Sequence, residues 1–401
     1  MNWNLRPILV AIWRSPTGAL LVALQVALAL AVLVNAAGIV QQRVQKVGRP
    51  NGMDTPNQFV VAVSGFTREF DYTAMLATDL AWLRGLPGVV AASVTSAVPL
   101  LDSGSSAGIR NAPGLKAGRQ ANIFEMDEQG LAALGVRLVA GRAFSAEEIL
   151  PPAQGNQALP QILLTRALAR VLFPDGDALG RQVYDPLDRP ITVTGIIEHM
   201  HGNWVDWDKL DHVAIVPRVP EGPQALYLVR TRAGERDALM RRVEEHMATS
   251  DPTRLLLWVR SMSSIERRAY LADRNLAIFL TAVTAALLLV AALGIFGLAT
   301  YNVAARTRQI GTRRALGARR GDIVRHFLLE SSLVTTAGAT AGVALALAAG
   351  YWLSVTWQLP RPGLLHLSTG VAAVWIIGLL AAWQPARRAA AVPPAVATRT
   401  V

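Results

Sequence analysis

Histidines and carboxylates gather in one short stretch of this 401-residue sequence, directly after a predicted strand. Residues 198–212 contain three of the six histidines, together with Glu198, Asp206, Asp208 and Asp211. Imidazole and carboxylate groups are ligands for divalent metals. The candidate ligands are His199, His201 and His212. A solvated loop after a strand also collects Asp and His without a pattern, so we expect no metal and keep this site as the alternative.

Other chemistry-bearing motifs are missing from the sequence. It contains no G-x-S-x-G, H-E-x-x-H or C-x-x-C pattern, and it has no cysteine to indicate a redox compartment. A phosphate-binding loop needs a lysine after a glycine. None of the three lysines, Lys46, Lys116 and Lys209, follows a glycine. We therefore expect no catalytic residue, no cofactor on this chain and no ATP hydrolysis by the chain itself.

Four long runs without a charged residue separate the basic clusters. Each run exceeds the roughly 20 apolar residues that cross a bilayer as a helix. The first run is also longer than the apolar core of a signal peptide, so we expect an uncleaved anchor. The predicted division is a 1–16 amphipathic segment, spans at 17–40, 273–304, 331–354 and 367–384, an outer domain at 41–272, loops at 305–330 and 355–366, and a tail at 385–401.

The net charge of +11 is confined to the parts that flank these spans. Residues 41–272 hold 25 basic and 25 acidic side chains, which leaves 14 basic and 3 acidic ones elsewhere. Basic residues beside apolar spans indicate the cytoplasmic side of a membrane rather than nucleic acid binding. We therefore predict that both termini and the 305–330 loop are cytoplasmic, next to anionic lipid, and that residues 41–272 are extracytoplasmic.

The outer domain alternates short strand patterns with helix patterns, which is typical of an α+β domain. Strands are expected at Phe59–Val63, Val89–Val98 and Ile191–Ile197, a loop at 103–118 and a helix at Glu125–Leu134. At 232 residues this domain can hold two subdomains. The predicted fold class is a membrane α-helical protein with four transmembrane helices and an extracytoplasmic α+β domain, of two subdomains, between the first and second.

The cytoplasmic loop has the pattern of a basic helix-turn-helix. Thr307 is expected to cap a short helix, Gly317 to end it and Asp322 to cap the helix that follows. Ile310 and Leu316 offer an apolar surface among arginines. Seven arginines would also suffice simply to set topology, but a capped helix beside two glycines favours docking of a cytoplasmic partner. In the third span, Gly338 and Gly342 have the spacing of a helix-packing face.

The loop segment RQIGTRRALGARRGDIVRHFLLES closely resembles the cytoplasmic loop of FtsX-like ABC permeases. Gly130–Phe144, Leu164–Arg181 and Val193–Ile197 resemble the MacB-type periplasmic core domain, and the Pro385–Ala390 segment resembles the family's closing segment. The chain departs from the family at Gln309, where glutamate is usual, and at Thr398, where leucine is usual. The resemblance extends over nearly the whole chain.

The resemblance implies a permease that pairs with an identical or diverged second permease in the bacterial inner membrane, above a dimer of ATPase subunits that hold ATP and Mg²⁺. About 16 residues precede the first span, where full MacB-type chains carry their ATPase, so a separate ATPase subunit is expected. The expected coupling residues are Arg308, Gln309, Ile310, Gly311, Arg313, Arg314, Ala315, Leu316, Gly317 and Ala318.

The expected function is export of a hydrophobic, peptide or lipid-like substrate, with a periplasmic membrane-fusion adaptor as an open question. One alternative is an FtsX-like transmitter that passes mechanical signals to an extracytoplasmic enzyme. Another is a membrane sensor, although no predicted cytoplasmic segment exceeds roughly 30 residues.

Overall fold

The computed structural model describes residues 16–67, 70–152 and 157–393. The chain divides into two compact units, one formed by Met1–Gly48 with Ala272–Val401 and the other by Arg49–Leu271. We call the first the membrane unit and the second the inserted domain. The predicted amphipathic segment 1–16 lies outside the described residues except for Pro16, and so does the end of the tail.

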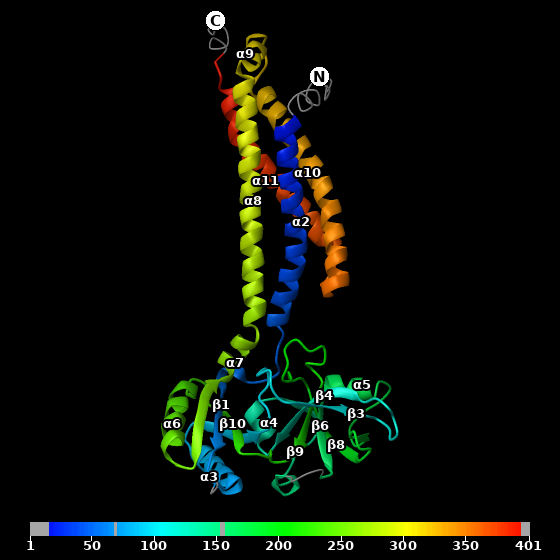
Figure 1. Ribbon diagram of the computed structural model, residues 1–401, viewed down its shortest axis with the longest axis vertical. Helices are drawn as coiled ribbons and strands as arrows, with labels where there is room; N and C mark the ends of the chain where they lie inside the picture. Colours follow the sequence, from blue (N-terminus) through cyan, green and yellow to red (C-terminus); the bar gives the residue numbers. More distant parts are fainter. Residues whose placement is uncertain (1–15, 68–69, 153–156, 394–401) are drawn as a thin grey trace. The chain divides into compact units, whose positions relative to one another are not determined.

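Within the described residues, four helices of the membrane unit are long and apolar enough to cross a membrane. Figure 1 shows them as long ribbons. They are α2 (Pro16–Val47), α8 (Leu271–Ala305), α10 (Arg320–Trp357) and α11 (Leu364–Ala390), and a short helix, α9 (Thr307–Ala315), lies between α8 and α10.

Three of these helices extend well beyond the predicted spans. Helix α2 continues to Val47, past the predicted end of the first span at residue 40, and Gly48 and Pro50 follow its end. Helix α10 already begins at Arg320, so together with α9 most of the predicted 305–330 loop is helical. Helix α11 runs through Pro385 to Ala390, where its last alanines are buried against neighbouring helices.

Helix α10 packs against both α2 and α11. Gly338 and Gly342 are buried where α10 meets α2. A Cβ atom on Gly338 would lie 2.7 Å from the Ala23 carbonyl oxygen, and one on Gly342 would lie 2.9 Å from the Ala27 carbonyl oxygen. The two glycines therefore allow the two backbones to approach more closely than any larger residue would permit.

A valine at Gly338 is expected to destabilise the membrane unit by about 1–3 kcal/mol, because its side chain has no space beside α2. Gly297 on α8 is the matched control, since a Cβ atom there would meet nothing within 4 Å. The thermal unfolding midpoint of the detergent-solubilised chain should fall for Gly338→Val and stay close to the parent value for Gly297→Val. Equal shifts for the two variants would contradict close packing at Gly338.

In the part of the chain that the structure describes, the inserted domain is built on one mixed sheet of eleven strands. The strands are β1 (Gln58–Gly65), β2 (Val89–Thr95), β3 (Ser105–Ile109), β4 (Arg119–Met126), β5 (Leu138–Gly141), β6 (Gln161–Thr165), β7 (Gln182–Tyr184), β8 (Pro190–Ile197), β9 (Val213–Pro217), β10 (Gln224–Thr231) and β11 (Arg254–Ser261). Their order is β11-β1-β10-β2-β4-β9-β6-β8-β5, with β3 beside β4 and β7 beside β8. The helices are α3 (Tyr72–Gly85), α4 (Gly130–Leu134), α5 (Arg166–Leu172), α6 (Arg236–Thr249) and α7 (Met262–Ala269).

Two hydrophobic cores divide this sheet into halves. In one half, α3 and α6 cover β1, β2 and β10; in the other, α5 covers β6, β8 and β9. The halves are joined through β2 and β4, which share the single residue pair Thr95 and Met126. The expected pair of subdomains is therefore present as two cores on a continuous sheet.

Two local predictions in this domain are wrong. The expected loop at 103–118 contains β3, and the expected helix Glu125–Leu134 is the end of β4 followed by the short helix α4. Strand β4 pairs with β9, about ninety residues further along the chain, in parallel register from Asn122 opposite Val213. Such long-range pairing overrides local propensity, which is all that a sequence pattern reports.

Candidate functional site

Helix α9 and the turn after it are defined by their own sequence. Gly317 has φ +98°, and the Ala318 N–H donates to the Arg313 carbonyl at 3.1 Å, which ends the helix. The Asp322 carboxylate accepts from the Arg319 N–H at 3.0 Å and starts α10. Thr307 does not cap α9 as expected, because its hydroxyl donates back to the Val303 carbonyl at 3.0 Å.

One face of α9 is held inside the membrane unit. Ile310 is only 4% exposed and packs with Phe327 of α10 and Ala386 of α11. The Arg314 Nη1 atom donates to the carbonyls of Ala390 at 3.1 Å and Val392 at 2.8 Å, at the end of α11. A guanidinium there satisfies carbonyls that have no partner within their own helix. This inner face attaches α9 to two membrane-crossing helices.

The opposite face of α9 and its turn are open. Leu316 is 83% exposed. The predicted coupling residues thus fall into two groups. The outward group is Arg308, Gln309, Arg313, Ala315, Leu316 and Gly317, and the inward group is Ile310, Gly311, Arg314 and Ala318. The prediction that Ile310 and Leu316 form one contact surface is wrong for Ile310, because Ile310 is buried.

The adjacent residues Arg313 and Arg314 are therefore expected to respond differently to truncation. Arg314→Ala should lower the thermal unfolding midpoint, because two carbonyls at the end of α11 lose a charged donor at a cost of about 1–3 kcal/mol. Arg313→Ala is the matched control, since its side chain is exposed and should leave the midpoint unchanged. The same loss of stability in both variants would contradict the division of α9 into two faces.

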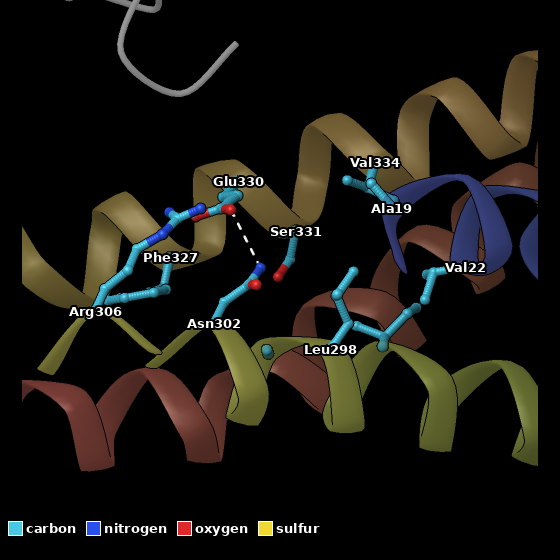
Figure 2. Close-up of a pocket in the computed structure, with 11 residues that line it drawn as sticks. Ala19, Val22, Leu298, Asn302, Arg306, Phe327, Glu330, Ser331 and Val334 are labelled. Carbon is cyan, nitrogen blue, oxygen red and sulfur yellow. Dashed lines mark hydrogen bonds and ion pairs between the residues drawn. The ribbon is translucent and has the colours of Figure 1, made fainter. Parts of the chain in front are cut away.

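A buried polar contact joins α8 to α10 beside α9 (Figure 2). Arg306 forms an ion pair with Glu330 at 3.0 Å, and the Asn302 Nδ2 atom donates to the same carboxylate at 3.2 Å. Glu330 is 5% exposed, at the polar end of a small pocket that continues between Ala19, Leu298 and Val334. The ion pair holds the end of α8, and therefore the start of α9, against α10.

Glu330 was not among the residues predicted from the sequence, although its acidic side chain stands out there. Outside residues 41–272 the chain has three acidic residues among 14 basic ones, and each makes a defined contact. Asp273 pairs with Arg43 at 2.6 Å and Lys46 at 2.8 Å, while Asp322 caps α10. An acid retained in a segment so rich in arginine is a candidate for a structural ion pair.

The structure brings together a set of candidate metal ligands in the inserted domain that differs from the predicted set by one residue. Among the described residues, one group of side chains places its donor atoms within 4.8 Å of one another, and it consists of His199, His201 and Asp211. His212, the third ligand considered from the sequence, is not a member of this group.

Comparison with known proteins places this architecture among membrane permeases. The profile of the MacB-like periplasmic core domain matches residues 19–246, and that of the FtsX-like permease C-terminal region matches residues 281–394. The macrolide export ATP-binding/permease protein MacB of Chromobacterium violaceum is 28% identical over 268 residues, which cover 65% of this chain and 40% of the relative. MacB of Salmonella choleraesuis is 27% identical over 286 residues, covering 64% and 41%.

Solved structures of similar proteins include the periplasmic region of MacB from Actinobacillus actinomycetemcomitans. It is 13% identical with a TM-score of 0.36, covering 56% of this chain and 97% of that one. The extracellular domain of the ABC-type transporter YknZ is 14% identical with a TM-score of 0.31, covering 50% and 100%.

Four membrane-crossing helices, with an α/β domain between the first and second and a short helix between the second and third, define a membrane permease component. The chain belongs to the MacB/FtsX-like family of ABC permeases, since the core-domain profile alone matches more than half of it. The chain spans about 40% of the length of the curated relatives it matches.

Proposed function

We propose that this chain is the transmembrane subunit of an ABC transporter that exports a hydrophobic, peptide or lipid-like substrate. An ABC ATPase, holding ATP and Mg²⁺, docks on the outward face of α9, and its opening and closing moves the inserted domain. The observation that carries this proposal is the contrast across α9. Leu316 is 83% exposed and available to a partner, on the same outward face as the cationic Arg313. Ile310, on the inner face, is buried between α10 and α11.

The contacts around α9 support a rigid transmission of force. Ile310 and Arg314 attach α9 to α10 and α11, and the Arg306–Glu330 pair attaches the end of α8 to α10. A displacement of α9 therefore pulls on three long helices at once. One of them, α8, leads directly in sequence to the inserted domain. A packed helix bundle passes such a displacement on because it is nearly incompressible.

The surroundings of the protein follow from charge and hydropathy. Because arginines cluster at α9, we place this end of the membrane unit in the cytoplasm, with the inserted domain on the outer side of a bacterial inner membrane. Only 11% of the most apolar 18-residue stretch of α8 is buried within this chain. A second permease, identical or diverged, would cover part of this surface. A periplasmic membrane-fusion adaptor is the partner we propose for the inserted domain in an export system.

A second candidate function is mechanical signal transmission to an extracytoplasmic enzyme, which the same topology would serve. The described parts of the four predicted spans hold Asp273 and Arg274 as their only charged side chains, at one end of α8, so they offer no ionisable conduction path through the bilayer core, which fits transport by mechanical motion rather than through a pore. One observation favours export over signalling. The curated relatives are macrolide export proteins by name.

Purification of the native complex under mild solubilisation, followed by identification of its chains, tests this proposal. We expect an ABC ATPase in stoichiometric amount, together with an adaptor for export. A co-purifying cell-wall hydrolase in place of the adaptor would instead establish the signalling function. Recovery of the chain without any ATPase, from cells in which the complex is crosslinked before lysis, would overturn both.

A further inference from the structure

His201 is a buried histidine whose ring nitrogens lack hydrogen-bond partners. Its side chain is 1% exposed, and neither Nδ1 nor Nε2 has a hydrogen-bond partner among the described residues. Buried polar atoms are nearly always satisfied, so an orphaned imidazole needs an explanation. The nearest charged group is Asp211, whose Oδ1 atom lies 3.5 Å from Nε2 and also lacks a hydrogen bond within the described part of the chain.

His199 belongs to the same group as His201 and Asp211, and one of its ring nitrogens is available to bind a cation. Its Nε2 atom lies 2.6 Å from the Pro50 carbonyl oxygen. A carbonyl only accepts, so Nε2 must carry the proton, and the Nδ1 lone pair remains for a ligand. A histidine that donates one ring N–H to a backbone carbonyl while the other nitrogen stays free is the usual arrangement around a protein-bound metal.

We infer that His199, His201 and Asp211 form a binding site for a divalent transition metal, with zinc the best fit. Two neutral imidazoles and one carboxylate are a common donor set for zinc, with a water molecule as the fourth ligand. Donor atoms on one zinc ion stand roughly 3.4 Å apart, so the observed group, within 4.8 Å, closes by small side-chain rotations.

The charges around the site suit a cation. Each histidine offers one ring nitrogen to the group, and Asp211 adds a carboxylate oxygen. The cationic Arg49 would oppose a metal ion, but its side chain is exposed and free to turn into solvent. The Asp211 side chain is 41% exposed, which gives an ion a path from solvent.

The position of the site suggests what the metal does. The His201 N–H donates to the Asn51 carbonyl at 3.2 Å. Gly52 (φ +78°) lies so close to His199 that a Cβ atom would stand 2.1 Å from its carbonyl oxygen. Residues 49–52 follow α2 directly in the chain. A bound metal would therefore fix the end of β8, the 202–212 loop and the segment through which the chain passes from α2 into the inserted domain. This inference is independent of ATPase docking.

The test is titration of the full chain, purified in detergent with a tag that lacks histidine and stripped with a chelator, using Zn²⁺ alone and then Co²⁺ alone. We expect one Zn²⁺ per chain with a dissociation constant below roughly 1 µM, and visible absorption from tetrahedral Co²⁺. Zn²⁺ should also slow hydrogen exchange of the amides at 49–53.

Variants locate the site. His199→Ala and Asp211→Asn, whose side chains reach the surface, should each weaken Zn²⁺ binding by at least about 10-fold. His212→Ala is the matched control and should bind normally. Failure of the stripped chain to bind either ion below about 10 µM would overturn the inference, and so would unchanged affinity in both ligand variants or an equal loss in His212→Ala.

Discussion

Leu316→Asp is expected to weaken association with the ATPase strongly while the membrane unit stays folded. An 83%-exposed leucine makes little contribution to the fold of its own chain, so a charge there costs almost no stability. In a docked complex the same side chain would be buried by the partner. Loss of such an apolar anchor costs about 2 kcal/mol or more, which weakens binding by roughly 30-fold.

Two further variants make this prediction specific. Leu316→Met keeps an apolar side chain of similar size and should retain ATPase binding and stimulated hydrolysis. Ile310→Asp should instead destabilise the protein itself, because its carboxylate would be buried beside Phe327 and Ala386. The measurements are co-purification of the ATPase, permease-stimulated hydrolysis and the thermal unfolding midpoint. If Leu316→Asp binds and stimulates the ATPase normally, α9 is not the docking site.

Glu330→Ala is expected to have the largest effect on the stability of the membrane unit. The substitution leaves the partly buried Arg306 guanidinium and the Asn302 amide without their acceptor. Removing one partner of a buried ion pair costs about 3–5 kcal/mol, mostly from the charge that is left uncompensated. The thermal unfolding midpoint in detergent should therefore fall by several degrees, and the coupling of ATP hydrolysis to the permease should weaken.

A double-mutant cycle separates the ion pair from simple loss of packing. Arg306→Ala/Glu330→Ala should be more stable than the sum of the two single changes predicts, because the double variant leaves no buried charge. Glu330→Gln, which keeps the shape and one acceptor oxygen, should fall between the parent and Glu330→Ala. Additive effects in the cycle would show that the two side chains do not interact in the membrane-embedded protein.

Sequence alone was sufficient for features that depend on neighbouring residues. The four helices that are long and apolar enough to cross a membrane are confirmed, because the length and apolarity of a run are local properties of the sequence. The end of α9 at Gly317 follows for the same reason, since a left-handed turn is a requirement of a single residue. The resemblance to the MacB/FtsX-like family is confirmed by the two profile matches.

Only the tertiary structure determines which residues that are distant in the chain come into contact. Ile310 and Leu316 look alike in sequence, and only the packing of α10 and α11 buries one of them and exposes the other. The same holds for β4, whose partner β9 lies about ninety residues away.

The ion pair of Glu330 and the histidine cluster likewise depend on contacts between residues that are distant in the chain. Glu330 of α10 forms an ion pair with Arg306 at the end of α8. The fold of the segment between β8 and β9 brings Asp211, and not its neighbour His212, close to His199 and His201. A sequence lists which charges and ligands are present. Which of them meet is decided by long-range packing, because residues remote in the chain come together only when the hydrophobic cores assemble.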